Sequence, residues 1–513
     1  MTGPLILVNS NIITMDRSDS RAGALAFEKG RIVRVGTVED MKNLLEQGWP
    51  SLDLGGRTVV PGFIDCHGHL MLTGNNVVGV PLADAADLAE VLERVADRAS
   101  TTEKGAWIRG GALNELRLKE KRLPTRDELD RVCPDHPVYL LHVTCHMCAV
   151  NTRALEIIRP PLDLPGLDLE SGRPTGVIRD PGILTFVHPL LGRLVTDEEK
   201  KNALLAGTDL ALRRGVTTLH ALDGGDLGPG DVKYITKVQH ELPIRLVCYN
   251  QSMNLAEVRE LGLPRIGGCI CADGAFEAHT AALFEPYADE PDNYGALTYS
   301  REVMEAFILE AHREGLQIAV HVEAERSIEQ VLWAMEKALR AHPRNDHRHR
   351  LEHVELPTWN QVDRMARAGI ISSLQPAFIP AFIGAERMEI YESLLGPARL
   401  DRVHPYRTFL KKGVALCGGS DSPVTPFSPL AGIQAAVTHP NPEQRISPRQ
   451  ALAMFTSGAA FAAFEERDKG SLEPGKLADL AVLSDDPGRV PEDGISAINV
   501  EMVLVGGETL FRL

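Results

Sequence analysis

Two histidines that end an apolar run have the spacing of metal ligands. His67 and His69 close the stretch VVPGFIDCHGH (residues 59–69), with Gly68 between them. Because successive side chains of a strand point to opposite faces, both imidazoles would lie on the same side. Imidazole nitrogen is a good ligand for Zn²⁺. The chain has 17 histidines in 513 residues, and about half of one such pair is expected by chance, so the pair needs independent support.

A second pair of histidines has the same spacing. His347 and His349 lie in PRNDHRHR, a stretch rich in charged residues. Runs of charged residues most often form solvated faces or loops, so we interpret this pair as solvated. Of the two pairs, only His67 and His69 are therefore taken as candidate metal ligands.

The segments that must position these side chains are predicted to form an α/β barrel. Apolar β-branched runs alternate with helical stretches such as REVMEAFILEAHREG and TWNQVDRMARAG. One predicted strand is FIDCH, and seven more cover 216–222, 244–250, 266–272, 317–322, 349–354, 370–375 and 414–419. Eight nearly continuous hydrophobic strands separated by helices are typical of a parallel (β/α)8 TIM-type barrel.

The first two predicted strands are unusually far apart. About 150 residues separate them, whereas one βαβ unit of a barrel needs about thirty. We therefore expect an inserted subdomain after strand 1, at about 75–200. Both chain ends are also rich in short extended runs, such as LILVNSNIITM and NVEMVLVGGETLFRL, and the middle of the chain is not.

Three further candidate ligands occupy the ends of predicted barrel strands. His321 ends the fifth strand, His353 ends the sixth, and Asp421 follows the eighth in GGSDSPV. Active sites of such barrels lie at the carboxyl ends of the strands. Each residue alone is compatible with an ordinary hydrogen-bonded role, but together with the first pair they favour a metal site with a position open to water.

Composition indicates an ordinary globular protein that acts on small molecules. Hydrophobic residues make up 44% and charged residues 24%, and no stretch approaches the roughly 18 apolar residues of a membrane span. The net charge of −16 would repel nucleic acid and anionic membranes, so we expect a small-molecule substrate. Eight scattered cysteines and an N-terminus without a basic leader lead us to expect a reducing, cytoplasmic location.

A glycine-rich stretch does not match a nucleotide-binding loop. DGGDLGPGD, at 223–231, lacks the Lys-Ser/Thr of a phosphate loop and the dinucleotide fingerprint. The sequence therefore gives no support to a kinase, NTPase or dehydrogenase function.

Several motifs resemble one known family. VVPGFIDCHGH, RLEHVELP, SSLQPAF, GGSDSPV and GSLEPGKLADLAVL together resemble the amidohydrolase superfamily, in the branch of long amidohydrolases that includes N-substituted formamide deformylase. The resemblance covers essentially the whole chain. It implies a β-sandwich built from residues 1–60 and 469–513, around a metal-dependent barrel at 61–468 that carries the insertion. It also implies one or two divalent ions, usually zinc, held by His67, His69, His321 and His353, with Asp421.

The fourth strand departs from this branch. The branch typically has a metal-bridging lysine where GCICADG has Cys269. A thiolate is itself a zinc ligand, so we expect Cys269 to bind metal and to bridge two ions if two are present. A buried structural thiol is the alternative, and Cys271, on the same face, competes for the role.

Four more residues are candidates for substrate binding. His279, in DGAFEAHTAAL, replaces an arginine of the branch, which weakens the case for a carboxylate-bearing substrate; a solvated loop histidine is the alternative. His146, in TCHMC, matches a family histidine that reaches into the site. His220 ends the second strand, and Trp107 is a candidate wall of the pocket.

These observations predict a metal-dependent hydrolase of an amide-type C–N bond, such as that of an N-acyl or N-formyl amine. The metal would activate water, and Asp421 would carry its proton to the leaving nitrogen. Deamination or ring opening of a heterocycle by the same residues is one alternative, and a catalytically inactive binding protein is another. A homo-oligomer is an option, because relatives are often dimers or larger.

Overall fold

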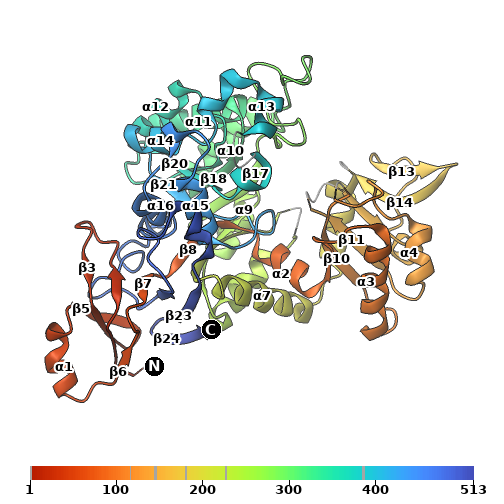
Figure 1. Ribbon diagram of the computed structural model, residues 1–513. Helices are drawn as coiled ribbons and strands as arrows, with labels where there is room; N and C mark the ends of the chain where they lie inside the picture. The colour runs from red at the N-terminus through yellow and green to blue at the C-terminus, as the bar shows by residue number, and fades with distance from the viewer. Residues whose placement is uncertain (1–2, 116, 144–146, 180–181, 226–227, 384–387) are drawn as a thin grey trace. The chain divides into compact units, whose positions relative to one another are not determined.

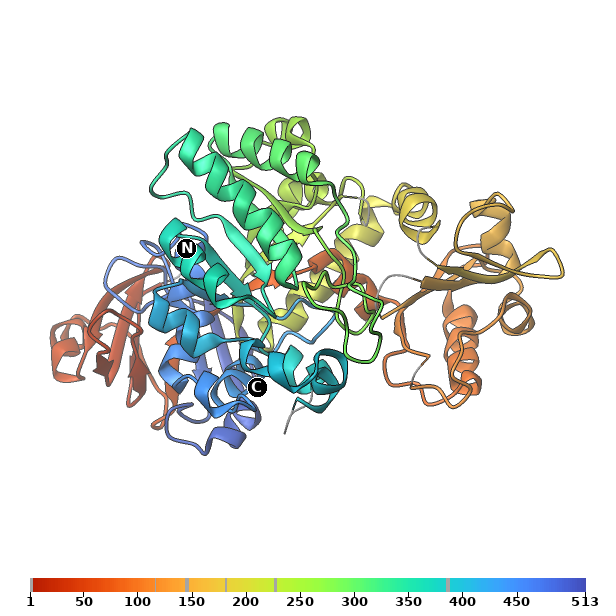
Figure 2. The same ribbon diagram turned by 90° about the horizontal axis from the view of Figure 1, so that it is seen from above.

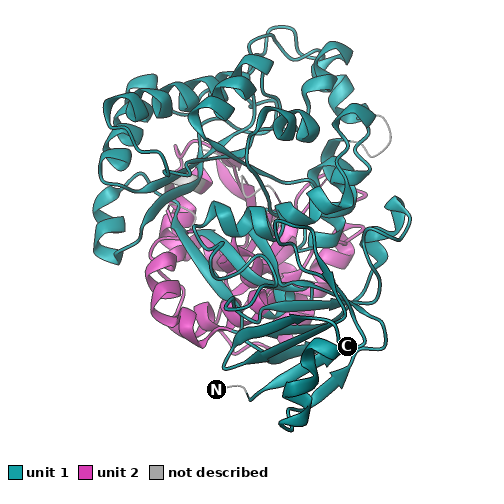
Figure 3. Cartoon of the chain, turned by 90° about the vertical axis from the view of Figure 1, so that its left-hand side faces the viewer, with its two compact units in different colours: residues 1–68, 209–222, 243–513 teal, residues 69–208, 223–242 magenta. Residues whose placement is uncertain are grey.

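The computed structural model describes residues 3–115, 117–143, 147–179, 182–225, 228–383 and 388–513. The chain forms two compact units (Figure 3). Unit 1 comprises 1–68, 209–222 and 243–513, and unit 2 comprises 69–208 and 223–242. No helix within the described ranges is both long enough and apolar enough to cross a membrane.

Unit 1 is built around an eight-stranded sheet that is nearly closed into a barrel. Its strands, in spatial order, are β21 (Leu416–Gly418), β20 (Ile371–Leu374), β19 (Arg350–His353), β18 (Gln317–Val322), β17 (Arg265–Cys271), β16 (Arg245–Asn250), β15 (Val216–Asp223) and β8 (Phe63–Gly68). A parallel bridge joins Gly68 to Ser422, and the backbone N–H of Asp421 donates to the carbonyl of His67 at 2.7 Å. These two contacts link the first and last strands, so the predicted TIM-type barrel is confirmed.

Amphipathic helices cover the outside of this sheet. Helix α11 (Glu325–Ala341) buries Ile328, Val331 and Met335, a spacing of three and four residues that places them on one face. Figures 1 and 2 show α10 (Arg301–Arg313), α11 and α12 (Trp359–Ala368) side by side beyond strands β17 to β20. The remaining α-helices of this unit are α1 (Lys42–Glu46), α9 (Leu255–Leu261), α13 (Glu389–Leu395), α14 (Tyr406–Lys412), α15 (Pro429–Val437), α16 (Pro448–Met454) and α17 (Ser457–Ala462).

The two chain ends together form a β-sandwich. One sheet has four strands, in the order β5 (Arg31–Gly36), β4 (Ala24–Glu28), β1 (Leu5–Val8) and β6 (Ser51–Asp53). The other sheet has six strands, in the order β24 (Glu508–Arg512), β23 (Val500–Val505), β22 (Leu480–Leu483), β7 (Thr58–Pro61), β2 (Asn11–Ile13) and β3 (Arg21–Ala22). In the second sheet, Val60 of β7 pairs with Ala481 of β22. One buried cluster joins Leu7 and Phe27 to Leu480, which confirms the sandwich predicted from both termini.

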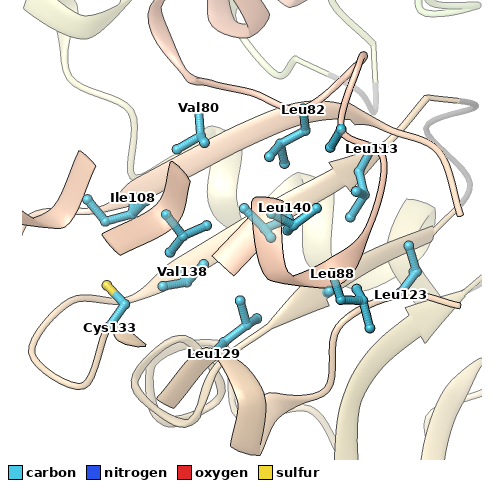
Figure 4. Close-up of a cluster of buried hydrophobic side chains, with 14 of the residues drawn as sticks. Val80, Leu82, Leu88, Ile108, Leu113, Leu123, Leu129, Cys133, Val138 and Leu140 are labelled. Carbon is cyan, nitrogen blue, oxygen red and sulfur yellow. The ribbon is translucent and has the colours of Figure 1, made fainter. Parts of the chain in front are cut away.

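Unit 2 has its own sheet and core. The sheet order is β13 (Leu167–Glu170), β14 (Arg173–Arg179), β12 (Met147–Val150), β11 (Val138–His142), β10 (Ile108–Leu113), β9 (Val80–Pro81). Its helices are α2 (Leu70–Val78), α3 (Leu88–Thr101), α4 (Arg126–Val132), α5 (Thr152–Ile158), α6 (His188–Gly192), α8 (Asp231–Val238) and most of α7 (Asp197–Leu212). Figure 4 shows Leu88, Leu129 and Leu140 converging in a buried cluster that the strands and helices share. This unit is the inserted subdomain expected after the first barrel strand.

The prediction that His347 and His349 are solvated is wrong. His347 is 3% exposed and His349 is 0% exposed. The backbone N–H of Ile318 donates to Nδ1 of His349 at 3.1 Å, and Nε2 of His349 lies 2.8 Å from Nδ1 of His312. The charged residues around this pair suggested a solvated loop, but the pair directly precedes β19 and is buried.

Candidate metal centre

His67 lies at the centre of a group of metal-ligating atoms. It is fully buried near the end of β8. Its Nε2 atom lies 3.1 Å from Sγ of Cys269 and 3.3 Å from Oδ1 of Asp421. These side chains come from β8, from β17 and from the loop after β21. The sequence-predicted strand ends therefore do converge at one end of the barrel.

Cys269 also belongs to a second group, with His321 of β18 and His353 of β19. Sγ of Cys269 lies 3.9 Å from Nε2 of His353, and the ring centroids of His321 and His353 are 4.4 Å apart. The ligand atoms of this group all lie within 4.8 Å of one another. The thiol is thus shared between two sets of candidate ligands.

His69 follows β8 directly and is two residues from His67 along the chain. Its ligand atom is grouped with those of His67, Cys269 and Asp421, again within 4.8 Å of one another. The structure therefore brings together the six residues that the sequence proposed as ligands: His67, His69, Cys269, His321, His353 and Asp421.

Backbone contacts fix the position of Asp421. Oδ1 of Asp65, on β8, accepts hydrogen bonds from the backbone N–H groups of His67 at 3.1 Å and Ser420 at 3.0 Å. Asp421 itself has a φ of 57° and His353 has a φ of 70°, both in the left-handed region that non-glycine residues rarely occupy. Such conformations persist only where the surrounding structure imposes them, and they concentrate at functional sites.

The imidazoles of this cluster differ in their electrostatic surroundings. Burial alone would lower the pKa of His67, but the neighbouring Cys269 and Asp421 raise it well above its usual value. The pKa of His321 is also raised, because Cys269 outweighs the effect of burial. Burial and the adjacent His321 lower the pKa of His353. Anionic and imidazole groups therefore face one another closely, as they do around a cation.

Sequence reasoning missed Glu352, which contacts Nδ1 of His67, the ring nitrogen that does not face Cys269. Oε2 of Glu352 lies 2.7 Å from Nδ1 of His67, and both side chains are fully buried. Burial would raise the pKa of Glu352, but Arg350 and His67 lower it to about 2. A signal was present in RLEH, because residues two apart on a strand share a face and Arg350 and Glu352 carry opposite charges.

A second set of acids follows the ends of β17, β18 and β19. The hydroxyl of Tyr391 contacts Oε2 of Glu355 at 2.6 Å and Oε1 of Glu277 at 3.1 Å. Desolvation and the adjacent Glu355 raise the pKa of Glu277 to about 7. Oε1 of Glu323 lies 3.9 Å from Nδ1 of His353. Sequence analysis did not select these acids, because nothing local to each one indicates that they meet.

The donor set fits a divalent cation. Imidazole nitrogens, a thiol and a carboxylate are the ligands found in zinc sites. Within each of the two groups the ligand atoms all lie within 4.8 Å of one another, and the other ring nitrogen of His67 is already hydrogen-bonded to a carboxylate, as is usual for metal-binding histidines.

The structure separates Cys269 from its competitor. Cys271 is exposed, its Sγ contacts the carbonyl of Cys269 at 3.5 Å, and it is in neither group of candidate ligands within the described residues. His279 is held by Asp289, with Nε2 at 2.9 Å from Oδ2, and its ring packs beside Tyr287. His279 is also outside both groups.

The other three substrate-binding candidates have different surroundings. His220 is fully buried inside β15, where Nδ1 lies 2.9 Å from Nη1 of Arg350, and burial lowers its pKa well below the usual value. Trp107 is in unit 2, where it packs against that unit's core and lies beneath the guanidinium of Arg109 at 5.5 Å. His146 lies outside the described residues.

Comparison with known proteins gives one family match and several relatives of similar length. The profile of the family described as Amidohydrolase family matches residues 51–511. Protein LONG AFTER FAR-RED 3 of Arabidopsis thaliana is 30% identical, over 99% of this chain and 91% of that protein. N-substituted formamide deformylase of Arthrobacter pascens is 28% identical, over 94% of both chains.

A solved structure shares the fold along nearly the whole chain. An uncharacterized metal-dependent hydrolase from Pyrococcus horikoshii OT3 superposes with a TM-score of 0.81 and 25% sequence identity. The superposition covers 96% of this chain and 99% of that one.

Proposed function

The chain belongs to the amidohydrolase family and is a metal-dependent hydrolase of C–N bonds; from that premise we propose that it removes a formyl or other acyl group from the nitrogen of a small amide. The proposed metal ligands are His67, His69, Cys269, His321, His353 and Asp421, and the proposed ion is zinc, as one or two ions. The choice of an N-acyl substrate is supported by the similarity to a protein named for deformylation of N-substituted formamides.

The chain's own residues suggest how the reaction proceeds. When bound, a divalent ion supplies Lewis acidity, which lowers the pKa of water and polarises the carbonyl of the amide. We assign to Asp421 the role of accepting a proton from the attacking water, which is supported by the 3.3 Å separation of its Oδ1 atom from Nε2 of His67. The same carboxylate then delivers that proton to the departing nitrogen, which is a poor leaving group unless it is protonated.

Asp421 is held rigidly for this transfer. Its backbone N–H donates to the carbonyl of His67, and the carbonyl of Asp421 accepts from the N–H of Val424 at 2.8 Å. The backbone N–H of Ser420 also donates to Asp65, so Ser420 and Asp421 are both hydrogen-bonded to β8. A fixed general acid and base contributes more than a mobile one, because the proton moves over a short and constant distance.

One observation carries the proposal: Sγ of Cys269 lies within 3.9 Å of the Nε2 atoms of both His67 and His353, which come from strands distant in the sequence. A structural thiol needs no such surroundings. Protonated imidazoles and thiols packed this closely would be costly to bury, whereas a shared cation would satisfy them all.

The test combines metal analysis with a substrate panel. The purified protein is stripped of metal, reloaded with zinc and assayed against N-formyl amines, N-acyl amines, cyclic amides and aminoheterocycles. We expect metal-dependent release of amine from an N-formyl or N-acyl compound. Turnover of only the cyclic amides or aminoheterocycles would reject the proposed substrate, and a protein that binds no divalent ion would reject the proposed site.

A further inference from the structure

We propose that Glu352 and Arg350 act as a positioning pair, which holds His67 in the tautomer and orientation that leave its Nε2 atom available as a metal ligand. The inference rests on the proposed function, because it assigns a role in metal binding to two residues that are not themselves proposed ligands. Glu352 contacts both His67 and Arg350, and all three side chains are buried.

Glu352 joins the histidine to the arginine. Its Oε2 atom accepts from Nδ1 of His67 at 2.7 Å and from Nη2 of Arg350 at 2.8 Å. Its Oε1 atom accepts from Nε of Arg350 at 2.7 Å. The arginine therefore binds the carboxylate through two parallel hydrogen bonds, a geometry that keeps the carboxylate charged and fixes its plane.

Arg350 is anchored in turn by the surrounding strands. Nη1 lies 2.9 Å from Nδ1 of His220 on β15 and 3.0 Å from the hydroxyl of Tyr249 on β16. Nη2 also donates to the carbonyl of Cys66 on β8 at 2.8 Å and to Oγ of Ser373 on β20 at 3.0 Å. All three guanidinium nitrogens are thus hydrogen-bonded, and the side chain cannot rotate without breaking contacts to four other strands.

The tautomer of His67 follows from these contacts. A charged carboxylate can only accept, so Nδ1 of His67 must carry the hydrogen that it donates to Glu352. In the neutral imidazole the lone pair is then on Nε2, the atom that faces Cys269 and Asp421. A metal ion requires a lone pair at that position.

A purely structural role would not select this arrangement. A buried ion pair is weak evidence for stability, because apolar residues of similar volume are often as stable or more stable. The feature that apolar residues could not supply is an acceptor for Nδ1 of His67. We therefore assign the pair to the orientation of His67, with the arginine acting through the glutamate.

The test measures metal affinity and the surroundings of the bound ion, not activity alone. Wild-type protein, Glu352→Gln, Arg350→Lys and the control Arg348→Lys are stripped of metal and titrated with Zn²⁺ against a chromophoric chelator. We expect Glu352→Gln and Arg350→Lys to bind about 10- to 100-fold more weakly, as is typical when the partner of a ligating histidine is lost. Arg348→Lys makes the same substitution at another buried arginine, which is bound to Asp346 and Glu466 and not to Glu352, so its affinity should stay within about 3-fold of wild type.

Absorption spectra of the Co²⁺-loaded proteins provide the second readout. Bands of Glu352→Gln and Arg350→Lys should shift in position or intensity, because His67 is no longer held at one angle, whereas Arg348→Lys should match wild type. Arg350→Lys keeps a positive charge beside Glu352, so it remains informative if Glu352→Gln fails to fold. Wild-type affinity and an unchanged cobalt spectrum in the folded variants would overturn the positioning role, whereas a wild-type protein without metal would instead overturn the proposed function.

Discussion

Sγ of Cys269 lies 3.1 Å from Nε2 of His67, at the strand position where the long amidohydrolases that this chain resembles typically carry a lysine. Lysine bridges metal ions only after it has been carboxylated, whereas a thiol needs only to lose its proton. The cysteine therefore offers a direct ligand with no prior modification. We therefore expect metal binding to depend on Cys269.

Cys269→Ser should weaken metal binding on the order of 10²-fold or more, because a hydroxyl is a far poorer zinc ligand than a thiolate. Equilibrium titration with a competing chelator measures this loss. Cys271→Ser is the matched control, since Cys271 is exposed and lies outside the ligand groups. Equal affinity in the two variants would remove Cys269 from the metal site.

Asp421→Asn should separate metal binding from proton transfer. The asparagine oxygen can still face the ion, so most of the metal should be retained. Turnover should fall ~10²-fold or more, because an amide cannot take up and release the proton. Metal content and the rate at saturating substrate, measured on the same sample, test this role; turnover close to that of wild type would contradict it.

Gly419→Ala should disturb His67 from outside the ligand set. A Cβ atom at residue 419 would lie 2.5 Å from the backbone nitrogen of His67 and 2.7 Å from its Cβ. Neither atom can move without shifting β8, so we expect a loss of about 1–3 kcal/mol in the free energy of unfolding, together with weaker metal binding.

Gly494→Ala is the control for this substitution, because its new Cβ would meet only Pro491, at 4.0 Å. Denaturant unfolding of both variants provides the comparison. If both variants lose the same free energy of unfolding, the close approach of residue 419 to His67 does not explain the loss.

The buried histidines His312, His347 and His349 should make the protein sensitive to mild acid. Burial lowers the pKa of each, most strongly for His349. The folded state therefore resists protonation, while the unfolded chain takes up protons as the pH falls below about 6.5. Stability is therefore full above that pH and falls below it, most strongly because of His349, whose limiting contribution is about 1.4 kcal/mol per pH unit.

His349→Asn tests this contribution by removing one titrating group. Between pH 7.5 and 5.5 the variant should lose about 1.4 kcal/mol less free energy of unfolding in total than wild type. His240→Gln, at an exposed histidine with 74% of its side chain accessible, should leave this loss unchanged. An unaltered loss in His349→Asn would mean that this histidine does not resist protonation.

The sequence predicted the barrel because its strands carry a regular signal. Runs such as VTTLHAL and QIAVHV are mostly apolar, and β15 and β18, which lie where those runs do, are buried on both faces. The ligands could be predicted for the same reason. His67, His321 and His353 end such strands, and parallel strands of a barrel present their carboxyl ends at one edge.

What the sequence did not reveal depends on contacts between distant strands. Arg350 and Glu352 look like residues of a solvated surface, and only the closed barrel places them beside His67 and His220. His349 was misjudged for the same reason, since its burial depends on Ile318 and His312. Charge next to a strand end does not distinguish a solvated loop from the interior of a barrel.

Anomalous diffraction at the zinc absorption edge tests most directly whether side chains from separate strands share one cation. Crystals of protein reloaded with stoichiometric zinc should show a peak about 2.0–2.3 Å from Nε2 of His67 and from Sγ of Cys269. A map with no peak at these atoms, or with zinc bound only elsewhere, would contradict the proposed metal centre and the function built on it.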